Sequence, residues 1–272
     1  MIGDLKFDLD SENFYIMRIL LGSFMRSRVL LALVDSSSRL NTLRNDLGKS
    51  SATVLHAVSE LESYNLTIKD YKDYCLSSKG FIYALALDKL VKNLYIFQSN
   101  PNFWQKHDID NLPNEFVENA YLLKDSTYIS TDKRDMEKPV NDYFKNIKNS
   151  DNIRVILPVF SEIYLEMILK SLRGDHKLEL IVDDKVFGSL KNSSYFNRIL
   201  RLSKEKKLVL KKYFGDLSLF LTIGNDFISL NLFDMEGFFD DSETIFNKTS
   251  DGVKWGEIIF NFYLDNSSTV VL

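Results

Sequence analysis

The sequence predicts an α+β protein in which a winged helix-turn-helix domain, residues 1–98, precedes an α/β domain, residues 99–272. Three observations support this division. Apolar residues recur at helical spacing through most of the first domain, and one short stretch there alternates with the period of a β-strand. Beyond residue 98, strand and helix patterns alternate, which favours a mainly parallel sheet covered by helices.

Two helices are expected before residue 48. Apolar side chains recur at helical spacing from Ser11 to Val34, which predicts a first helix over this segment. A second, short helix is predicted from Leu40 to Leu47. Gly48 follows it directly, where a left-handed C-terminal cap would end the helix.

A third helix is predicted from Ser51 to about Tyr64, with Ser50 or Ser51 as its N-cap. Its inner face carries the apolar residues Val54, Ala57, Val58 and Leu61. The period then changes to that of a strand, so that residues 66–76 predict a β-hairpin with a charged tip. A long helix is expected from Gly80 to Gln98. Three helices followed by a hairpin are typical of a winged helix-turn-helix.

The second domain shows strand and helix signals in turn. Strands are expected at residues 126–131, 153–157, 177–182, 207–213, 217–223 and 227–233, and helices at 160–172, 184–202 and 252–264.

Composition excludes several classes of protein. A single cysteine, Cys75, rules out an internal disulfide framework and any multi-cysteine metal site. The three histidines form no spaced ligand motif, and no glycine-rich phosphate loop or nucleophile arrangement occurs. We therefore expect no metal, no cofactor and no enzymatic activity. Because the first ten residues lack the order of a signal peptide and no apolar run is long enough for a membrane span, we expect a cytoplasmic protein without membrane contact.

The predicted helix 51–64 is the candidate recognition helix for double-stranded DNA. Such a helix enters the major groove with its N-terminal residues near the base edges. Hydroxyl and imidazole groups there suit hydrogen bonds to bases or phosphates. The candidate contact residues are Ser50, Ser51, Thr53, His56 and Ser59. The alternative is that these are merely exposed polar residues of a protein-interaction module.

Lys49, Lys69 and Lys72 are the candidate phosphate contacts, with ordinary solvated lysines as the alternative. Residues 26–80 hold eight basic and six acidic side chains, and the whole chain has a net charge of -4. Each chain can therefore make few phosphate contacts, so DNA affinity should depend on dimerisation. The first and last helices of this domain carry more apolar surface than so small a domain can cover, which predicts a homodimer.

The winged-helix pattern and two segments of the second domain together resemble a known family. The segments are Phe103-Trp104…His107-Asp108-Ile109…Leu112-Pro113 and Gly237-Phe238-Phe239-Asp240…Trp255…Ile259-Phe260. With them, nearly the whole chain resembles the archaeal winged-helix transcriptional regulators of the methanogenesis-regulator type. The resemblance implies a DNA-binding regulator whose second domain is similar to phospholipase-D-like α/β domains without the catalytic motif of the enzymes.

A ligand site is expected at the carboxyl ends of the strands, where α/β folds usually bind small molecules. The candidate lining residues for an unidentified small-molecule effector are Thr131, Pro158, Asp183 and Tyr213. Asp183 is equally suited to be a helix N-cap. Trp104 and Trp255 are expected in the core or at a domain interface.

A second class of function remains open. Some methyltransferase-like enzymes use a winged helix only to dimerise, and the chain could belong among them. The missing glycine-rich cofactor loop speaks against this alternative.

Overall fold

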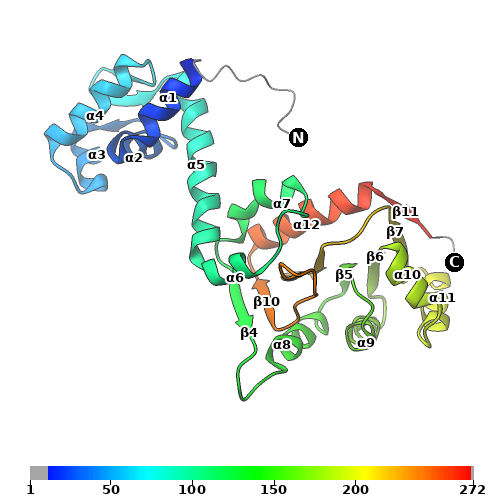
Figure 1. Ribbon diagram of the computed structural model, residues 1–272. Coiled ribbons are helices and arrows are strands. Elements are labelled where there is room, and N and C mark those ends of the chain that lie inside the picture. Colours follow the sequence, from blue (N-terminus) through cyan, green and yellow to red (C-terminus); the bar gives the residue numbers. More distant parts are fainter. Residues whose placement is uncertain (1–11, 271–272) are drawn as a thin grey trace. The chain divides into compact units, whose positions relative to one another are not determined.

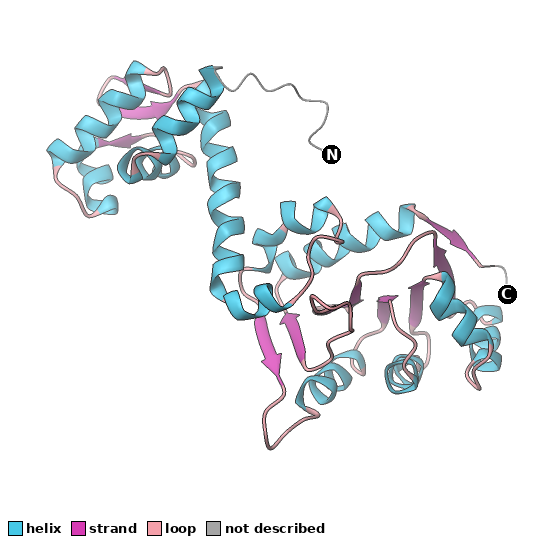
Figure 2. Cartoon of the chain, in the orientation of Figure 1, coloured by secondary structure: helices cyan, strands magenta, loops and turns pink. Residues whose placement is uncertain are grey.

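The computed structural model describes residues 12–270, and its contacts divide the chain into two compact units, Met1–Lys92 and Asn93–Leu272 (Figures 1 and 2). Helix α5 (Ser78–Ser99) begins in the first unit and ends in the second. Each unit has its own apolar core.

The first unit opens with two helices rather than the single one predicted from Ser11 to Val34, whose first residue lies outside the described part of the chain. Helix α1 (Glu12–Leu21) is followed by α2 (Phe24–Ala32). Gly22 and Ser23 separate them. The Oγ of Ser23 accepts a hydrogen bond from the backbone N–H of Arg26, which starts a new helix.

The helix pair that follows confirms the capping predictions. Strand β1 (Ser38–Arg39) leads into α3 (Leu40–Leu47), which ends at Gly48 with a left-handed φ of 62°. Helix α4 (Ser51–Ser63) has Ser50 as its N-cap. Its inner face is buried as predicted, at Val54, Ala57, Val58 and Leu61.

The predicted hairpin is also present, as β2 (Thr67–Asp70) and β3 (Asp73–Leu76). Together with β1 it forms a small antiparallel sheet in the order β1-β3-β2. Helix α5 packs so closely beneath the hairpin that a Cβ at Gly80 would overlap the carbonyl oxygen of Leu66. Only glycine fits at this crossing.

The described part of the second unit contains eight strands, β4 (Thr127–Ser130), β5 (Asn152–Leu157), β6 (Lys177–Val182), β7 (Leu208–Tyr213), β8 (Leu219–Ile223), β9 (Ile228–Leu232), β10 (Glu243–Asn247) and β11 (Ser267–Thr269). They form one sheet in the order β11-β7-β6-β5-β8-β9-β10-β4. Only β5, β6 and β7 run parallel to one another, and every other neighbouring pair is antiparallel, so the prediction of a mainly parallel sheet was wrong. One of the antiparallel pairs has a local cause, because the turn at residues 224–226 joins β8 directly to β9 without a crossover helix.

Helices cover both faces of this sheet (Figure 1). One apolar cluster takes Ile156 of β5 and the other takes Val155, as expected for alternating side chains. Both tryptophans are buried in the first of these clusters, as predicted. The helices on its side are α6 (Pro101–Lys106), α7 (Asn114–Glu118), the 3-10 turn Ala120–Leu123 and α12 (Ser250–Asp265). On the opposite face lie α8 (Lys138–Ile147), α9 (Glu162–Ser171), α10 (Asp184–Lys191) and α11 (Phe196–Lys204).

Across the described residues, no helix has both the length and the apolar character that a membrane crossing requires.

Candidate nucleic-acid interface and ligand positions

The N-terminal turn of α4 presents polar groups outward. The Oγ of Ser50 accepts from the backbone N–H of Thr53 at 3.2 Å and lies 2.8 Å from the Thr53 hydroxyl. Ser59, farther along the same helix, is exposed as well, and Ser51 is half-buried. The positive end of the helix dipole lies at this turn, which favours an anion such as a phosphate beside it.

His56 is exposed one turn later, and its Nδ1 lies 3.3 Å from a carboxylate oxygen of Glu60. Both oxygens of Glu60 accept hydrogen bonds from the guanidinium of Arg26 at 2.9 Å. Arg26 also donates to the carbonyl oxygen of Ile19, so its charge is used within the unit. Because Glu60 occupies Nδ1 of His56, Nε2 is the ring nitrogen left for a contact with DNA. The sequence analysis did not identify this role of Glu60.

The hairpin carries Lys69 and Lys72, both exposed. The Lys69 ammonium lies 5.7 Å from the ring centroid of Tyr74, and the Lys72 ammonium lies 5.9 Å from that of Tyr71. Tyr71 forms the tip with a φ of 55° and is 88% exposed. Sequence reasoning overlooked this tyrosine, although an aromatic residue between charged ones at a hairpin tip is a visible signal.

Lys49 lies between α3 and α4, and its backbone N–H donates to the carbonyl oxygen of Arg44 at 3.0 Å. Arg44 is exposed on α3, the first helix of the pair. In a helix-turn-helix this first helix crosses the DNA backbone. Arg44 therefore belongs with the phosphate candidates, and only the focus on lysines kept it out of the sequence-based set.

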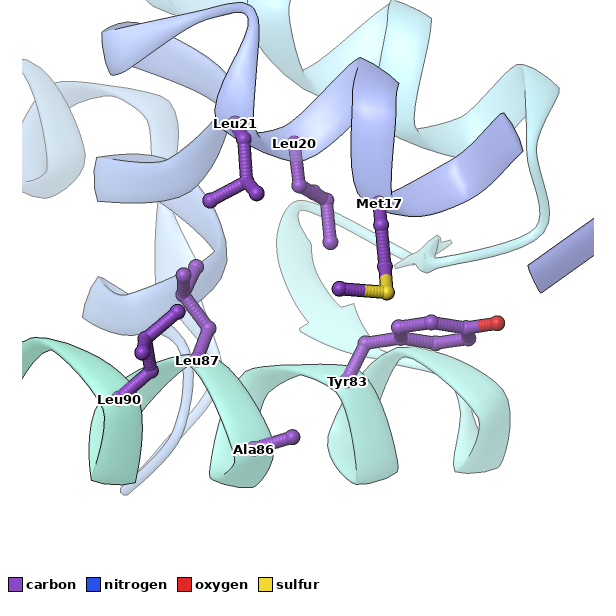
Figure 3. A pocket seen from close by; sticks show the side chains of 7 residues that line it. All are labelled: Met17, Leu20, Leu21, Tyr83, Ala86, Leu87 and Leu90. Carbon is purple, nitrogen blue, oxygen red and sulfur yellow. The ribbon is translucent and has the colours of Figure 1, made fainter. Parts of the chain in front are cut away.

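An apolar groove lies between α1 and α5 (Figure 3). In Figure 3, Met17 and Leu20 point from α1 toward the side chains on α5. The groove is lined entirely by apolar and aromatic residues, namely Met17, Leu20, Leu21, Tyr83, Ala86, Leu87 and Leu90.

In the second unit, three of the four candidate ligand residues share one row at the sheet edge. Leu157, Val182 and Lys212 are in register on the parallel strands β5, β6 and β7. The next residues along these strands are Pro158, Asp183 and Tyr213, so the three lie side by side.

Thr131 is not part of this row. It follows β4, which is four strands away from β5 in the sheet. At about 4.8 Å per strand, the two positions are separated by roughly 19 Å. A small molecule shorter than this distance cannot contact both positions.

Asp183 and Tyr213 of this row also have structural roles. The Oδ1 of Asp183 accepts from the backbone N–H of Val186 at 2.8 Å, which confirms the N-cap alternative. The ring of Tyr213 contacts that of Tyr263, with 5.1 Å between centroids. Nearby, Lys185 donates to Asp216 at 2.9 Å, and this hydrogen bond raises the pKa of the lysine.

The fold brings together the two segments of the second unit on which the family resemblance depends, one around His107 and the other around Asp240. His107 and Asp240 are 133 positions apart, and the Nε2 of His107 lies 3.2 Å from Oδ2 of Asp240. Lys106 pairs with the same oxygen at 2.5 Å and with Glu243 at 3.5 Å. Among the described residues, His107, Asp240 and Glu243 are the one group whose ligand atoms lie close enough to share a metal ion.

Burial opposes the ionisation of Asp240, but hydrogen bonds from Lys106 and Ser242 outweigh it and hold the pKa of the carboxyl below its ordinary value. Burial likewise disfavours the charged form of Lys106, and its bonds to the two carboxylates still raise the pKa of its ammonium. Both groups are therefore charged at neutral pH.

Two family models and a curated relative match most of this chain, and all three are of the methanogenesis regulatory protein FilR1. Residues 14–95 match the N-terminal domain of the methanogenesis regulatory protein FilR1, and residues 136–266 match its middle domain. The FilR1 protein of Methanothrix harundinacea (strain 6Ac) is 25% identical over 258 residues, which cover 92% of this chain. The chain spans 57% of the length of that relative.

Two solved structures show weaker similarity. TrmBL2, described as an archaeal chromatin protein, aligns over 96% of this chain and 100% of its own with a TM-score of 0.43 and 15% identity. An O-methyltransferase family protein from Burkholderia thailandensis aligns over 72% of this chain and 63% of its own with a TM-score of 0.24 and 7% identity. Similarities at this level carry no information about function.

Proposed function

This chain belongs to the family of the archaeal methanogenesis regulatory protein FilR1, and we propose that it is a transcriptional regulator whose first unit is a winged helix that binds double-stranded DNA. The observation that carries the proposal is the two-sided character of α4. Its inner face is buried, whereas the hydroxyl of Thr53 and the imidazole of His56 are exposed near its N-terminus. This is the geometry with which a recognition helix reads base edges.

The remaining contacts follow from this placement. Ser50, Ser51 and Ser59 contribute polar groups along α4, and the N-terminus of the helix binds a phosphate. Lys49 and Arg44 contact the DNA backbone beside the turn between the helices, and Lys69 and Lys72 contact it from the hairpin. These contacts are few, so a single chain binds weakly.

We propose that two chains bind DNA together. The groove between α1 and α5 is apolar throughout, and Leu21 and Leu90 at its rim are exposed. A second copy with its own α1 and α5 is the natural occupant, because a two-fold axis brings the same apolar faces together and presents two recognition helices to two half-sites.

The second unit is proposed to be the effector-binding part, of the phospholipase-D-like kind that the family resemblance implies. Pro158, Asp183 and Tyr213 form one side of the proposed small-molecule site at the carboxyl edge of the sheet. Thr131 lies too far away to share it. The chain is proposed to act in the cytoplasm and to convert no substrate.

A gel-shift assay with DNA from the promoter of its own gene tests the central proposal. We expect retarded bands at lower protein concentration than with unrelated DNA of the same length, and weaker binding as salt rises. Equal affinity for both DNAs at every salt concentration would contradict sequence-specific regulation.

A thermal-shift screen of metabolites, followed by gel shifts with each hit, tests the effector site. A true effector must bind the two states of the dimer with different affinity, typically by about 1–3 kcal/mol. A hit that stabilises the protein without changing its DNA affinity would show that this chain has a ligand site that does not regulate DNA binding. Chemical conversion of a hit would favour the methyltransferase-like alternative.

A further inference from the structure

We propose that His107, Asp240 and Glu243 bind a divalent transition-metal ion. The site lies wholly in the second unit, uses none of Pro158, Asp183 and Tyr213, and goes beyond the function proposed above. His107 follows α6, Asp240 lies in the loop between β9 and β10, and Glu243 begins β10.

The first argument is the orientation of the His107 ring. Its side chain is fully buried, and its Nδ1 lies 2.7 Å from the carbonyl oxygen of Phe103. Since a carbonyl oxygen can only accept, Nδ1 is the donating nitrogen, and Nε2 faces Oδ2 of Asp240 at 3.2 Å. Oδ2 also pairs with the ammonium of Lys106. An ion that replaces this ammonium would contact Nε2 and Oδ2 together.

This arrangement matches the supporting contacts of histidine ligands in metalloproteins. A ligating imidazole almost always donates its other N–H to a backbone carbonyl or a carboxylate, which holds the ring in one orientation. The bond from Nδ1 to Phe103 supplies this support. The ring of Phe103 also lies 4.1 Å from the His107 ring, between centroids.

The carboxylates are held in the same way. The Oδ1 of Asp240 accepts from the backbone N–H of Ser242 at 2.9 Å and from its hydroxyl at 2.6 Å, which leaves Oδ2 directed toward His107. The amide nitrogen of Asn231, which is buried, donates to the carbonyl oxygen of Glu243 at 2.8 Å. These bonds fix the backbone that carries both carboxylates before any ion arrives.

Lys106 competes with the metal. Its ammonium lies between the carboxylates of Asp240 and Glu243 and neutralises part of their charge. The lysine side chain is 45% exposed, so it can turn toward solvent when an ion enters. One imidazole and two carboxylates then ligate the ion and leave further positions for water. Such a donor set suits zinc, iron, manganese or nickel better than magnesium or calcium, which prefer oxygen ligands alone.

The other two histidines provide matched controls. His176 has the same support, with Nδ1 2.9 Å from the carbonyl oxygen of Ser171 and Nε2 3.1 Å from Asp151. His56 pairs with Glu60. Within the described chain, neither belongs to a group of three ligand atoms close enough for one ion.

The test uses the full chain after treatment with a chelator, titrated with Zn²⁺ in a calorimeter and with Co²⁺ in an absorption spectrometer. We expect one ion per chain and visible Co²⁺ bands typical of nitrogen and oxygen ligands. Glu243→Gln keeps the shape of the side chain and should weaken binding about tenfold or more, whereas His176→Gln and His56→Gln should leave it unchanged. The midpoint temperature of thermal unfolding should rise by about 5–10 °C when the free Zn²⁺ concentration is about a hundred times its dissociation constant.

The Lys106→Met variant distinguishes a bound metal ion from the lysine ammonium as the cation of this cluster. If the metal site exists, this variant should bind Zn²⁺ more tightly than the parent chain and regain its thermal stability when the ion is added. If Lys106 is the permanent cation of the cluster, the variant should lose stability and Zn²⁺ should not restore it. Loss of binding only in His176→Gln or His56→Gln would also overturn the proposal, because the ion would then sit on a surface histidine.

Discussion

The two units of this chain differ in how completely they cover their apolar side chains. In the second unit, helices lie on both faces of the sheet, and large rings such as Trp255 and Phe116 are fully buried. In the first unit, α1 and α5 keep Leu21, Ile82 and Leu90 exposed beside an apolar groove. The second unit also exposes apolar side chains, such as Ile163 and Phe214, but the first unit places its own beside a groove lined only by apolar and aromatic residues, a face suited to a further surface.

The same contrast applies to polar groups. The first unit presents its hydroxyls, imidazole and lysines outward along α4 and the hairpin. The second unit turns several polar groups inward, where Asn231, Thr222 and His107 are buried and hydrogen-bonded. We therefore expect the first unit to bind an extended partner. In the second unit, we expect the buried hydrogen bonds to hold side chains and loops in fixed positions.

The largest effect is expected for Trp255→Ala. Its ring packs against Phe116 at 5.1 Å between centroids, and its removal should cost the second unit about 3–5 kcal/mol of unfolding free energy. The two tryptophans both lie in the second unit, so the fluorescence of Trp104 reports that unit alone. Urea unfolding should show an earlier fluorescence transition, while circular dichroism retains a later one from the first unit. A single common transition would contradict the independence of the two cores.

The next effect is expected for Leu90→Glu, which places a charge in the groove. Burying one leucine side chain contributes about 1.5–3 kcal/mol, and a symmetric dimer loses two, so its dissociation constant should rise at least about a hundredfold. Sedimentation equilibrium measures the change. Ile163→Glu is the control, since Ile163 is also apolar and exposed but lies on α9 of the second unit. Equal dissociation by both variants would argue against the groove as the dimer interface.

A smaller effect is expected on DNA recognition. Thr53→Ala and His56→Ala should lower the preference for operator over unrelated DNA by about 1–3 kcal/mol for each true base contact. Lys72→Ala should weaken binding to all DNA alike and reduce the slope of log affinity against log salt by about one unit. Fluorescence anisotropy with both DNAs at several salt concentrations distinguishes these results. An unchanged operator preference in His56→Ala would remove this histidine from the base-reading set.

The smallest effect compares two helix caps, one in each unit. Ser50→Ala and Asp183→Ala each remove an N-cap acceptor and should each cost about 1 kcal/mol of stability in their own unit. Asp183→Asn keeps an acceptor oxygen and should remain nearly as stable as the parent. If Asp183 also binds the effector, this asparagine variant should lose effector binding at almost unchanged stability, measured by thermal shift with and without the ligand.

Local features of the fold were predictable because their causes lie within a few residues. Gly48 ends α3 and Ser50 caps α4 through bonds to neighbouring backbone groups, and the spacing of Val54, Ala57 and Val58 already indicates the buried face. The six strands expected in the second unit are present for the same reason.

Features that depend on distant partners were missed or misjudged. Strand β10 was not predicted, and it is defined by its pairing with β4 and β9, which periodicity does not reveal. The separation of Thr131 from Pro158 depends on the strand order, and the meeting of His107 with Asp240 depends on the loop after β9. No spacing rule along the sequence connects residues so far apart.

The strand order also has a consequence for synthesis on the ribosome. Strand β4 pairs only with β10, about 115 residues later, so at roughly 5–20 residues per second it waits about 6–23 s for its partner. The partner strands of the first unit's hairpin, β2 and β3, are by contrast close neighbours in the sequence. During that interval β4 offers an open edge to other nascent chains, and this edge is where we expect misassembly to begin when the protein is produced too quickly.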